Sequence, residues 1–275
     1  MGQQVDLYGS TYGSFAERVL ATVRRETFGE DIGQNSWITA DELRRFLAWL
    51  DLTATAQLLD VGCGSGGPAL FIARASGCRV TGIDETPQAI ATATQTAHAA
   101  GLSQSLRFQV ADANASLLWT SATFDAILCI DAINHLADRR RVLQEWHRVL
   151  KPGGRVLFTD PVVVTGAITK DEIAVRSSIG HFVFVPRGEN ERQLEAVGFR
   201  VLRCEDVTEN AAQVACRWQH ARERHGAELV QLEGEERFVG LQAFFAMVHR
   251  LSSERRLSRL AYLAQKAGID EASTL

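Results

Sequence analysis

Short apolar runs alternate with amphipathic segments along most of the chain. Runs such as residues 57–61 are largely apolar, as strands buried on both faces of a sheet are. The segments between them repeat apolar residues every three or four positions, which indicates helices with one buried face. This alternation predicts an α/β fold with a doubly wound, mostly parallel sheet.

Seven strands and four helices follow from this pattern. The predicted strands span residues 57–61, 79–83, 106–110, 124–130, 155–160, 199–206 and 260–265. The predicted helices span residues 68–76, 87–100, 137–149 and 191–197. Gly101 and Gly198 follow two of these helices, where glycine commonly ends a helix.

Segments of a different kind flank this core. Residues 1–50 predict an N-terminal helical cap, because apolar residues recur at helical spacing over 14–26 and Thr39 opens a second helix. Residues 161–190 break the alternation and predict an irregular flap over the substrate. Residues 208–250 predict a C-terminal helical insertion, which fits either a wall of the substrate pocket or the face of a homodimer.

Three glycines at alternate positions follow the first predicted strand. Gly62, Gly64 and Gly66 let the backbone turn sharply and approach a ligand closely. Asp84 ends the second strand, 24 residues after Asp60, where a carboxylate can accept both hydroxyls of a ribose. Nicotinamide enzymes favour G-x-G-x-x-G, whereas this chain has G-x-G-x-G. The pattern therefore predicts a nucleoside cofactor of another kind.

Further landmarks continue along the chain. Asp112 follows the third strand, residues 124–129 form the fourth, and Leu-Lys-Pro-Gly-Gly at 150–154 precedes the fifth. With the glycine loop, they resemble the class I S-adenosylmethionine-dependent methyltransferases over roughly residues 50–165. Within that family, the segment around Trp37 and the long helical tail are most similar to small-molecule enzymes of the phosphoethanolamine and glycine or sarcosine type.

The resemblance implies that the cofactor is S-adenosylmethionine. Asp84 would hold its ribose, Asp112 and Ala113 its adenine, and the segment around Trp37 would close over its methionine end. The alternative for Asp112 is a helix cap, and the alternative for the segment around Trp37 is a loop with one core tryptophan. Cys63 is interpreted as a small residue that fills space in the glycine turn. The implied cofactor-binding residues are Ser36, Trp37, Asp60, Gly62, Cys63, Gly64, Gly66, Asp84, Glu85, Asp112, Ala113 and Cys129.

Candidate catalytic residues follow the fourth strand, because substrates of open α/β sheets bind beyond the carboxyl ends of the strands. Asp131 and His135 lie there, and a histidine with the ordinary pKa of about 6.5 suits proton removal at neutral pH. The alternatives are a helix-capping or packing histidine at His135 and, at Asp131, a carboxylate that accepts structural hydrogen bonds from loop amides. The candidate substrate-binding residues are Tyr12, Asn134, His135 and His181.

Asp131 and Asp160 also occur where metal-dependent catechol methyltransferases place two acids. That group has an asparagine directly after the second acid, whereas this chain has Pro161. We therefore predict no catalytic metal.

Composition narrows the class of partner. The net charge of −4 disfavours a nucleic-acid surface, which needs clustered Lys and Arg, and the basic run at 139–141 is interpreted as a solvated helix face. The five cysteines lack regular spacing, and no apolar run nears the roughly 18 residues of a membrane span. We therefore expect a cytoplasmic protein with a small-molecule substrate and no nucleic-acid or membrane partner.

These observations predict one domain, with the cap at 1–50, a cofactor-binding core at 51–165 and the flap, helical insertion and last strands at 166–275. The expected function is transfer of a methyl group from S-adenosylmethionine to a nitrogen, oxygen or carbon of a small metabolite. One alternative is a protein that binds S-adenosylmethionine but catalyses a cyclisation or binds a partner. Another is a nicotinamide dehydrogenase, which the glycine spacing disfavours.

Overall fold

A mixed sheet of eight strands runs through the computed structural model, which describes residues 8–268. Its order is β3-β2-β1-β4-β5-β8-β7, and the short β6 pairs with β5 off this path. Strands β1 to β5 pair in parallel, whereas β8 is antiparallel to both β5 and β7. The strands span Gln57–Val61 (β1), Arg79–Asp84 (β2), Leu106–Val110 (β3), Phe124–Cys129 (β4), Leu150–Val164 (β5), Val185–Pro186 (β6), Phe199–Asp206 (β7) and Leu257–Lys266 (β8).

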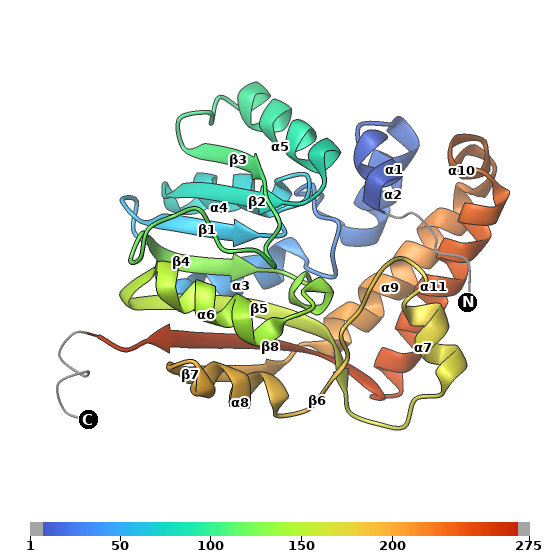
Figure 1. Ribbon diagram of the computed structural model, residues 1–275. Helices are drawn as coiled ribbons and strands as arrows, with labels where there is room; N and C mark the ends of the chain where they lie inside the picture. The colour runs from blue at the N-terminus through green and yellow to red at the C-terminus, as the bar shows by residue number, and fades with distance from the viewer. Residues whose placement is uncertain (1–7, 269–275) are drawn as a thin grey trace.

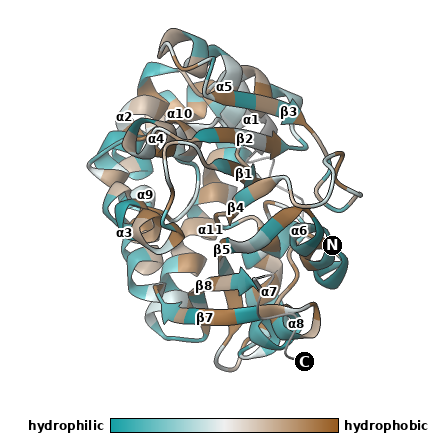
Figure 2. Ribbon diagram, turned by 90° about the vertical axis from the view of Figure 1, so that its left-hand side faces the viewer, coloured by the Kyte–Doolittle hydropathy of each residue, from teal (hydrophilic) through white to brown (hydrophobic). Residues whose placement is uncertain are grey.

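Helices cover both faces of the sheet and one end of it (Figure 1). Helices α3, α4 and α5 pack on one face, and α6 and α8 pack on the other (Figure 2). No helix within residues 8–268 is long and apolar enough to cross a membrane. The helices span Tyr8–Gly13 (α1), Arg18–Phe28 (α2), Ala40–Leu50 (α3), Gly67–Ser76 (α4), Pro87–Ala99 (α5), Arg139–Val149 (α6), Lys170–Arg176 (α7), Glu189–Ala196 (α8), Thr208–Arg224 (α9), Gly226–Glu233 (α10) and Glu235–Ser253 (α11), with a 3₁₀ turn at Ile133–His135 (η1).

The strands build one hydrophobic layer on each face of the sheet. Leu59 and Val61 of β1 belong to the layer that contains the buried Trp146 of α6. Leu58 belongs to the opposite layer, with Phe46 of α3 and residues of α4. Successive side chains of a strand point to opposite faces, so one apolar run supplies both layers.

A third hydrophobic cluster lies beyond the carboxyl ends of the parallel strands. It joins α2 to the helical insertion α9–α11, on the right of Figure 1, and it includes Trp37, Trp218, Phe244 and Phe245. The Trp218 and Phe245 rings stack with their centroids 4.8 Å apart. The cap and the insertion, both predicted as helical, therefore pack against each other next to the strand ends.

The observed strands confirm the predicted doubly wound fold. Strands β1, β3 and β7 have the predicted bounds, β2 and β4 differ by one residue at one end, and β5 and β8 extend beyond the prediction. β5 begins at Leu150, because this residue already pairs with Phe124 ahead of a bulge. The helix predicted over 14–26 begins at Arg18 and ends at Phe28. Residues 1–7 of the predicted cap lie outside the described residues.

Residues 161–190, predicted as an irregular flap, contain regular structure. β5 continues to Val164 and pairs there with the two-residue β6, which is too short to show any hydrophobic periodicity. Helix α7 opens with a capping box, in which Thr169 Oγ1 accepts from the Glu172 amide (3.3 Å) and the Glu172 carboxylate accepts from the Thr169 amide (2.9 Å). The prediction of irregular structure is therefore wrong for these parts and is right for residues 177–184.

The basic run at 139–141 is not solvated throughout. The Arg139 side chain is 3% exposed, and its Nη1 donates to Asp160 Oδ2 and to Asn190 Oδ1, both at 2.6 Å. Asn190 Nδ2 also donates to Asp160 Oδ2 (2.9 Å). Arg139 begins α6 and its side chain points at β5, so the interpretation as a solvated helix face is wrong for this residue. The interpretation is right for Arg140, which is exposed.

We predict that Arg139→Met lowers the free energy of unfolding by about 3 to 5 kcal/mol, because it leaves Asp160 as a buried charge without its counter-ion. Arg140→Met is the matched control, since the same substitution at an exposed neighbouring position should change stability by no more than about 0.5 kcal/mol. Urea denaturation at pH 7 measures both. Equal effects of the two substitutions would show that the buried pair does not stabilise the fold.

Candidate functional site

Glycine is required at Gly62 and Gly64 in the turn between β1 and α4. Gly64 has a φ of 52°, and a Cβ there would lie 2.7 Å from the Tyr12 hydroxyl oxygen. A Cβ on Gly62 would lie 2.5 Å from the Cβ of Ala132. The Gly62 amide donates to the Ile83 carbonyl oxygen (2.8 Å), which ties the turn to the end of β2. The glycines therefore let three segments meet at the carboxyl ends of the strands.

Asp84 is held in place by backbone amides at the end of β2. Its Oδ2 accepts from the Gly64 amide (3.0 Å), and its Oδ1 accepts from the Thr86 amide (2.9 Å). A carboxylate has about four lone-pair positions, so two hydrogen bonds leave acceptor capacity for a ligand. The neighbouring Glu85 is exposed.

Asp60 is a buried acid at the other side of the glycine turn. Its side chain is almost inaccessible, and its Oδ2 has no hydrogen-bond partner among the described residues. Burial, with a further contribution from the charge of Asp84, raises the pKa of Asp60 to about 7. A buried carboxylate with an unpartnered oxygen is costly by itself, and it fits a ligand that brings a positive charge or a donor.

These groups line one cavity of about 420 Å³ at the carboxyl ends of the parallel strands, which is within the usual size range of ligand pockets. It brings together most of the predicted site. The predicted residues on its wall are Tyr12, Ser36, Asp60, Gly62, Cys63, Gly64, Asp84, Glu85, Asp112, Ala113, Asp131, His135 and His181.

Four predicted site residues do not line this cavity. Gly66 caps α4 behind the turn, and Cys129 is fully buried in the sheet core, where burial raises the pKa of its thiol. The Trp37 ring packs into the third hydrophobic cluster, although its neighbour Ser36 lines the cavity. Asn134 faces a smaller cavity next to the first.

Asp112 lies in the loop between β3 and β4. Its Oδ1 accepts from the Asn114 amide (2.8 Å) and from Asn114 Nδ2 (3.0 Å), which closes a local turn. No helix begins at this point of the described chain, so the helix-cap alternative for Asp112 finds no support.

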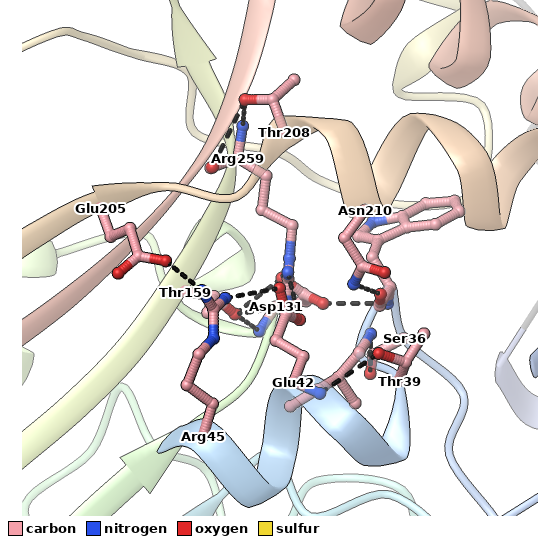
Figure 3. A network of polar contacts seen from close by, with 12 residues as sticks. Ser36, Thr39, Glu42, Arg45, Asp131, Thr159, Glu205, Thr208, Asn210 and Arg259 are labelled. Carbon is pink, nitrogen blue, oxygen red and sulfur yellow. Dashed lines mark hydrogen bonds and ion pairs between the residues drawn. The ribbon is translucent and has the colours of Figure 1, made fainter. Parts of the chain in front are cut away.

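Asp131 is the most heavily bonded acid of the cavity wall (Figure 3). Its Oδ2 accepts from the Trp37 amide (2.9 Å), and its Oδ1 accepts from Thr159 Oγ1 and from Arg259 Nε, both at 2.7 Å. Its backbone is left-handed, with a φ of 53°, which is uncommon for a residue other than glycine. One of these contacts, with the Trp37 amide, is of the kind expected if Asp131 bonds loop amides, whereas the other two are with side chains.

Arg259 of β8 completes this network and was not predicted from the sequence. Its guanidinium is buried, and Nη1 donates to Glu42 Oε2 of α3 (2.6 Å) as Nε donates to Asp131. Burial alone would lower the pKa of Arg259, but the two carboxylates raise it above its ordinary value. The signal in the sequence was an arginine directly before the apolar run at 260–264, since charged residues are rarely buried without a partner.

His135 lies at the end of η1, against the loop that follows α7. Its Nδ1 lies 2.9 Å from the His181 carbonyl oxygen, and its ring packs on Phe182 with the centroids 4.5 Å apart. A carbonyl oxygen only accepts, so Nδ1 carries the proton and Nε2 carries the lone pair. Burial lowers the pKa of His135 to about 4. The imidazole is therefore neutral at pH 7, with a pKa below the ordinary value that the sequence analysis assumed.

Asp160 does not lie on the cavity wall. Its carboxylate accepts hydrogen bonds from Arg139, Asn190 and the Val162 amide. Residues 8–268 contain no group of three or more His, Cys, Asp or Glu side chains arranged to hold a metal ion.

Several wall residues escaped the sequence analysis because they come from loops. Ile179 and Gly180 follow α7, and Thr86 and Asn114 neighbour predicted residues on the loops after β2 and β3. Asn35 precedes Ser36 in the segment that the resemblance had already singled out. Its position in that segment was the only signal in the sequence that Asn35 would line the cavity.

The comparisons with known proteins agree with this geometry. Residues 59–158 match a protein family described as "Methyltransferase domain". The chain is 30% identical over 213 residues to 27-O-demethylrifamycin SV methyltransferase of Amycolatopsis mediterranei. The match covers 73% of this chain and 76% of that enzyme. Several other curated relatives match over less than two thirds of their own length. Phosphoethanolamine N-methyltransferase 3 of Arabidopsis thaliana, for example, is 38% identical over 117 residues, which are 42% of this chain and 23% of that protein.

Solved structures share the fold. Phosphoethanolamine N-methyltransferase 2 of Haemonchus contortus, in complex with phosphomonomethylethanolamine and S-adenosylhomocysteine, has a TM-score of 0.79 at 19% identity over 94% of this chain and 59% of that one. The [4+2]-cyclase SpnF has a TM-score of 0.73 at 23% identity over 97% of this chain and 100% of that one. The matched family, the relative covered over most of its length and the cavity built on the glycine turn together show that this chain belongs to the S-adenosylmethionine-dependent methyltransferases.

Proposed function

We propose that this methyltransferase methylates a hydroxyl group of a small, largely apolar metabolite. The observation that carries the proposal is that the acids Asp60 and Asp84, the glycine turn and the neutral His135 share one cavity. One relative, which the chain matches over 76% of that protein's length, is named 27-O-demethylrifamycin SV methyltransferase. The name describes a compound that lacks a methyl group on an oxygen, which supports oxygen as the acceptor atom.

The residues of the glycine turn fit the cofactor. Asp60 Oδ2, buried and without a partner among the described residues, suits the ammonium group of the methionine portion, and the glycines leave room for its backbone. Asp84 has acceptor capacity left for the ribose hydroxyls, and Asp112 and Ala113 line the cavity where the adenine is expected. When bound, S-adenosylmethionine supplies an electrophilic methyl group on its sulfonium.

His135 is proposed to hold the acceptor hydroxyl through Nε2 and to take up its proton. Its low pKa keeps the ring neutral, and it also makes the imidazole a weaker base than one that titrates near neutrality. Asp131 is proposed as a positioning residue, because both of its carboxylate oxygens already accept from Trp37, Thr159 and Arg259.

The domain organisation follows the same proposal. Residues 1–50 serve as a cap, 51–165 as the cofactor-binding core and 166–275 as the substrate-facing part of a single cytoplasmic domain. The helical insertion buries its apolar stripes, such as Val214 and Trp218, against α2 and Trp37, which favours a wall of the substrate pocket over a homodimer face. The net charge of −4 supports a small-molecule partner rather than a nucleic acid.

The experiment that tests the proposed function is release of S-adenosylhomocysteine with a hydroxylated acceptor. Product that carries one additional methyl group on oxygen supports it. Conversion of a substrate without consumption of S-adenosylmethionine would instead favour the cyclase-like alternative, and methylation on nitrogen or carbon would contradict the choice of oxygen.

Asp84→Ala should weaken the binding of S-adenosylhomocysteine by about tenfold or more, because a hydrogen bond to a charged group contributes roughly 1.5 to 3 kcal/mol. Calorimetric titration measures the affinity. Asp41→Ala, which removes a fully exposed carboxylate of α3, is the control and should leave the affinity unchanged. An unchanged affinity for Asp84→Ala would exclude Asp84 from the cofactor site.

Asp60 makes the stability of the cofactor-free protein depend on pH. Its pKa is about 7 when folded and about 3.9 when unfolded, so the folded protein binds more protons between these values and loses stability as the pH rises through them. Asp60→Asn removes this loss. From pH 5 to pH 8, the stability of the variant relative to the unsubstituted protein should increase by about 1 to 3 kcal/mol.

Chemical denaturation without cofactor at both pH values checks this prediction. Asp112→Asn is the matched control, because Asp112 is an exposed carboxylate of the same cavity wall. A constant difference between Asp60→Asn and the unsubstituted protein would mean that Asp60 is ionised throughout the range.

His135→Ala should lower kcat by about 10²-fold, the lower end for a general base, because a base of low pKa contributes less. The affinity for S-adenosylhomocysteine should stay within about twofold.

The pH profile of kcat/KM for the unsubstituted enzyme should show no His135 titration near pH 6.5, since the folded pKa is about 4. A break near 6.5 that disappears in His135→Ala would show that the imidazole is solvated during turnover.

A further inference from the structure

A second, smaller cavity of about 30 Å³ adjoins the cofactor cavity. The two cavities share wall residues from the cap segment, from the end of β4 and from the loop after α7, namely Asn35, Ser36, Asp131, His135 and Ile179. The rest of its wall is mainly aromatic and comes from the flap and the helical insertion, with Phe182, Trp218, Phe244 and Phe245. A group in this side cavity therefore lies next to whatever reacts at His135.

Asn134 is an unexplained polar group on the wall of this side cavity. Its side chain is fully buried, and neither Oδ1 nor Nδ2 has a hydrogen-bond partner among residues 8–268. The backbone is fixed, because the Asn134 carbonyl oxygen accepts from the Val183 amide (2.7 Å). A buried amide left unsatisfied costs about 1 to 3 kcal/mol, so it fits a ligand that supplies the missing hydrogen bonds. Asn35 Nδ2, on the same wall, is also buried without a partner in the described chain.

The surroundings of Asn134 disfavour a cationic acceptor. The Arg176 guanidinium already lies over the Phe182 ring (4.6 Å to the centroid) and the Phe244 ring (5.2 Å), so a cation occupies the aromatic faces that would otherwise attract an ammonium group. Asp131, the acid on this wall, has both oxygens engaged by other donors. An amide next to aromatic rings instead suits a neutral group that both donates and accepts.

Size limits this group to a single small substituent. A cavity needs about 10 to 15 Å³ to hold one water molecule, so a volume of about 30 Å³ holds a hydroxyl or a carbonyl oxygen but no ring. Asn134 and His135 both line the side cavity. The group bound at Asn134 is therefore close to the group bound at His135 on the same acceptor.

We propose that Asn134 determines acceptor specificity, by binding a second oxygen that neighbours the reacting hydroxyl of a neutral, apolar acceptor. The substrate class is then a vicinal diol or a hydroxyl compound with an adjacent carbonyl, on an aromatic or otherwise apolar body. The inference rests on the proposed methylation of a hydroxyl group and adds the identity of the neighbouring group.

The experiment compares three probes, catechol, phenol and phosphoethanolamine, by release of S-adenosylhomocysteine. Catechol and phenol differ by one hydroxyl, so their ratio of kcat/KM reports the second binding group. A site that hydrogen-bonds a substrate hydroxyl rejects analogues that lack it, and we expect catechol to exceed phenol by about 10- to 100-fold. Asn134→Leu should bring this ratio close to one by lowering kcat/KM for catechol, while the value for phenol changes less than about threefold.

The control is Gln242→Leu in α11, which removes another amide with a buried, unpartnered oxygen, outside both cavities. It should leave the ratio of catechol to phenol unchanged. Asn134→Ala replaces Asn134→Leu if the leucine variant does not fold, as judged by its thermal unfolding midpoint.

The outcomes separate this inference from the proposed function. An unchanged ratio in a folded Asn134 variant would mean that the side cavity holds ordered water only, and would overturn the inference. Preferred methylation of phosphoethanolamine, or turnover of none of the probes by an enzyme that binds S-adenosylhomocysteine, would overturn the acceptor class and leave the cofactor site intact. Failure to bind S-adenosylhomocysteine would overturn the proposed function itself.

Discussion

The ion group formed by Asp131, Arg259 and Glu42 holds together segments that are distant in sequence. Arg259 lies between the two carboxylates, so β8 is bonded to the end of β4 on one side and to α3 on the other. The second oxygen of Asp131 reaches the amide of Trp37 and thereby fixes the cap segment over the strand ends. Buried charges are tolerated only when they are paired and hydrogen-bonded, so each member depends on the other two. The position of the cap over the cavity follows from this arrangement.

Charge is distributed unevenly around the cofactor cavity. Two acids, Asp60 and Asp84, flank the glycine turn, and the charge of Asp84 adds to the cost of ionising Asp60. Near His135, burial and the charge of Arg176 lower the pKa of the imidazole, and together they outweigh the opposite effects of the His181 carbonyl oxygen and of Asp131. A ligand with a cationic part and an uncharged part therefore has one favoured orientation in the cavity. This orientation comes from electrostatics and does not require a contact with every atom of the ligand.

The sequence predicted the parts of the fold that depend on hydrophobic periodicity. The buried run Gln57–Val61 gave correct strand bounds, because apolar residues on both faces leave little freedom in register. Most of the predicted cofactor residues line one cavity, because glycine spacing and strand ends place them by local geometry. Long-range pairing was missed, since nothing near Arg139 or Arg259 in the sequence shows that Asp160 or Asp131 will be the partner. Asn134 was identified by its position alone, and its lack of partners is visible only in three dimensions.

The antiparallel placement of β8 affects the order in which the cavity is completed during synthesis. Arg259 follows Asp131 by 128 residues and Glu42 by 217, so both acids leave the ribosome long before their shared counter-ion. Until then β5 lacks its antiparallel neighbour, and the cap segment lacks the carboxylate geometry that fixes Trp37. Closing such distant contacts is slow relative to forming local ones. A nascent chain can therefore form the parallel strands β1 to β4 early, yet the contacts of Asp131 and Glu42 with Arg259 can form only when residue 259 has emerged.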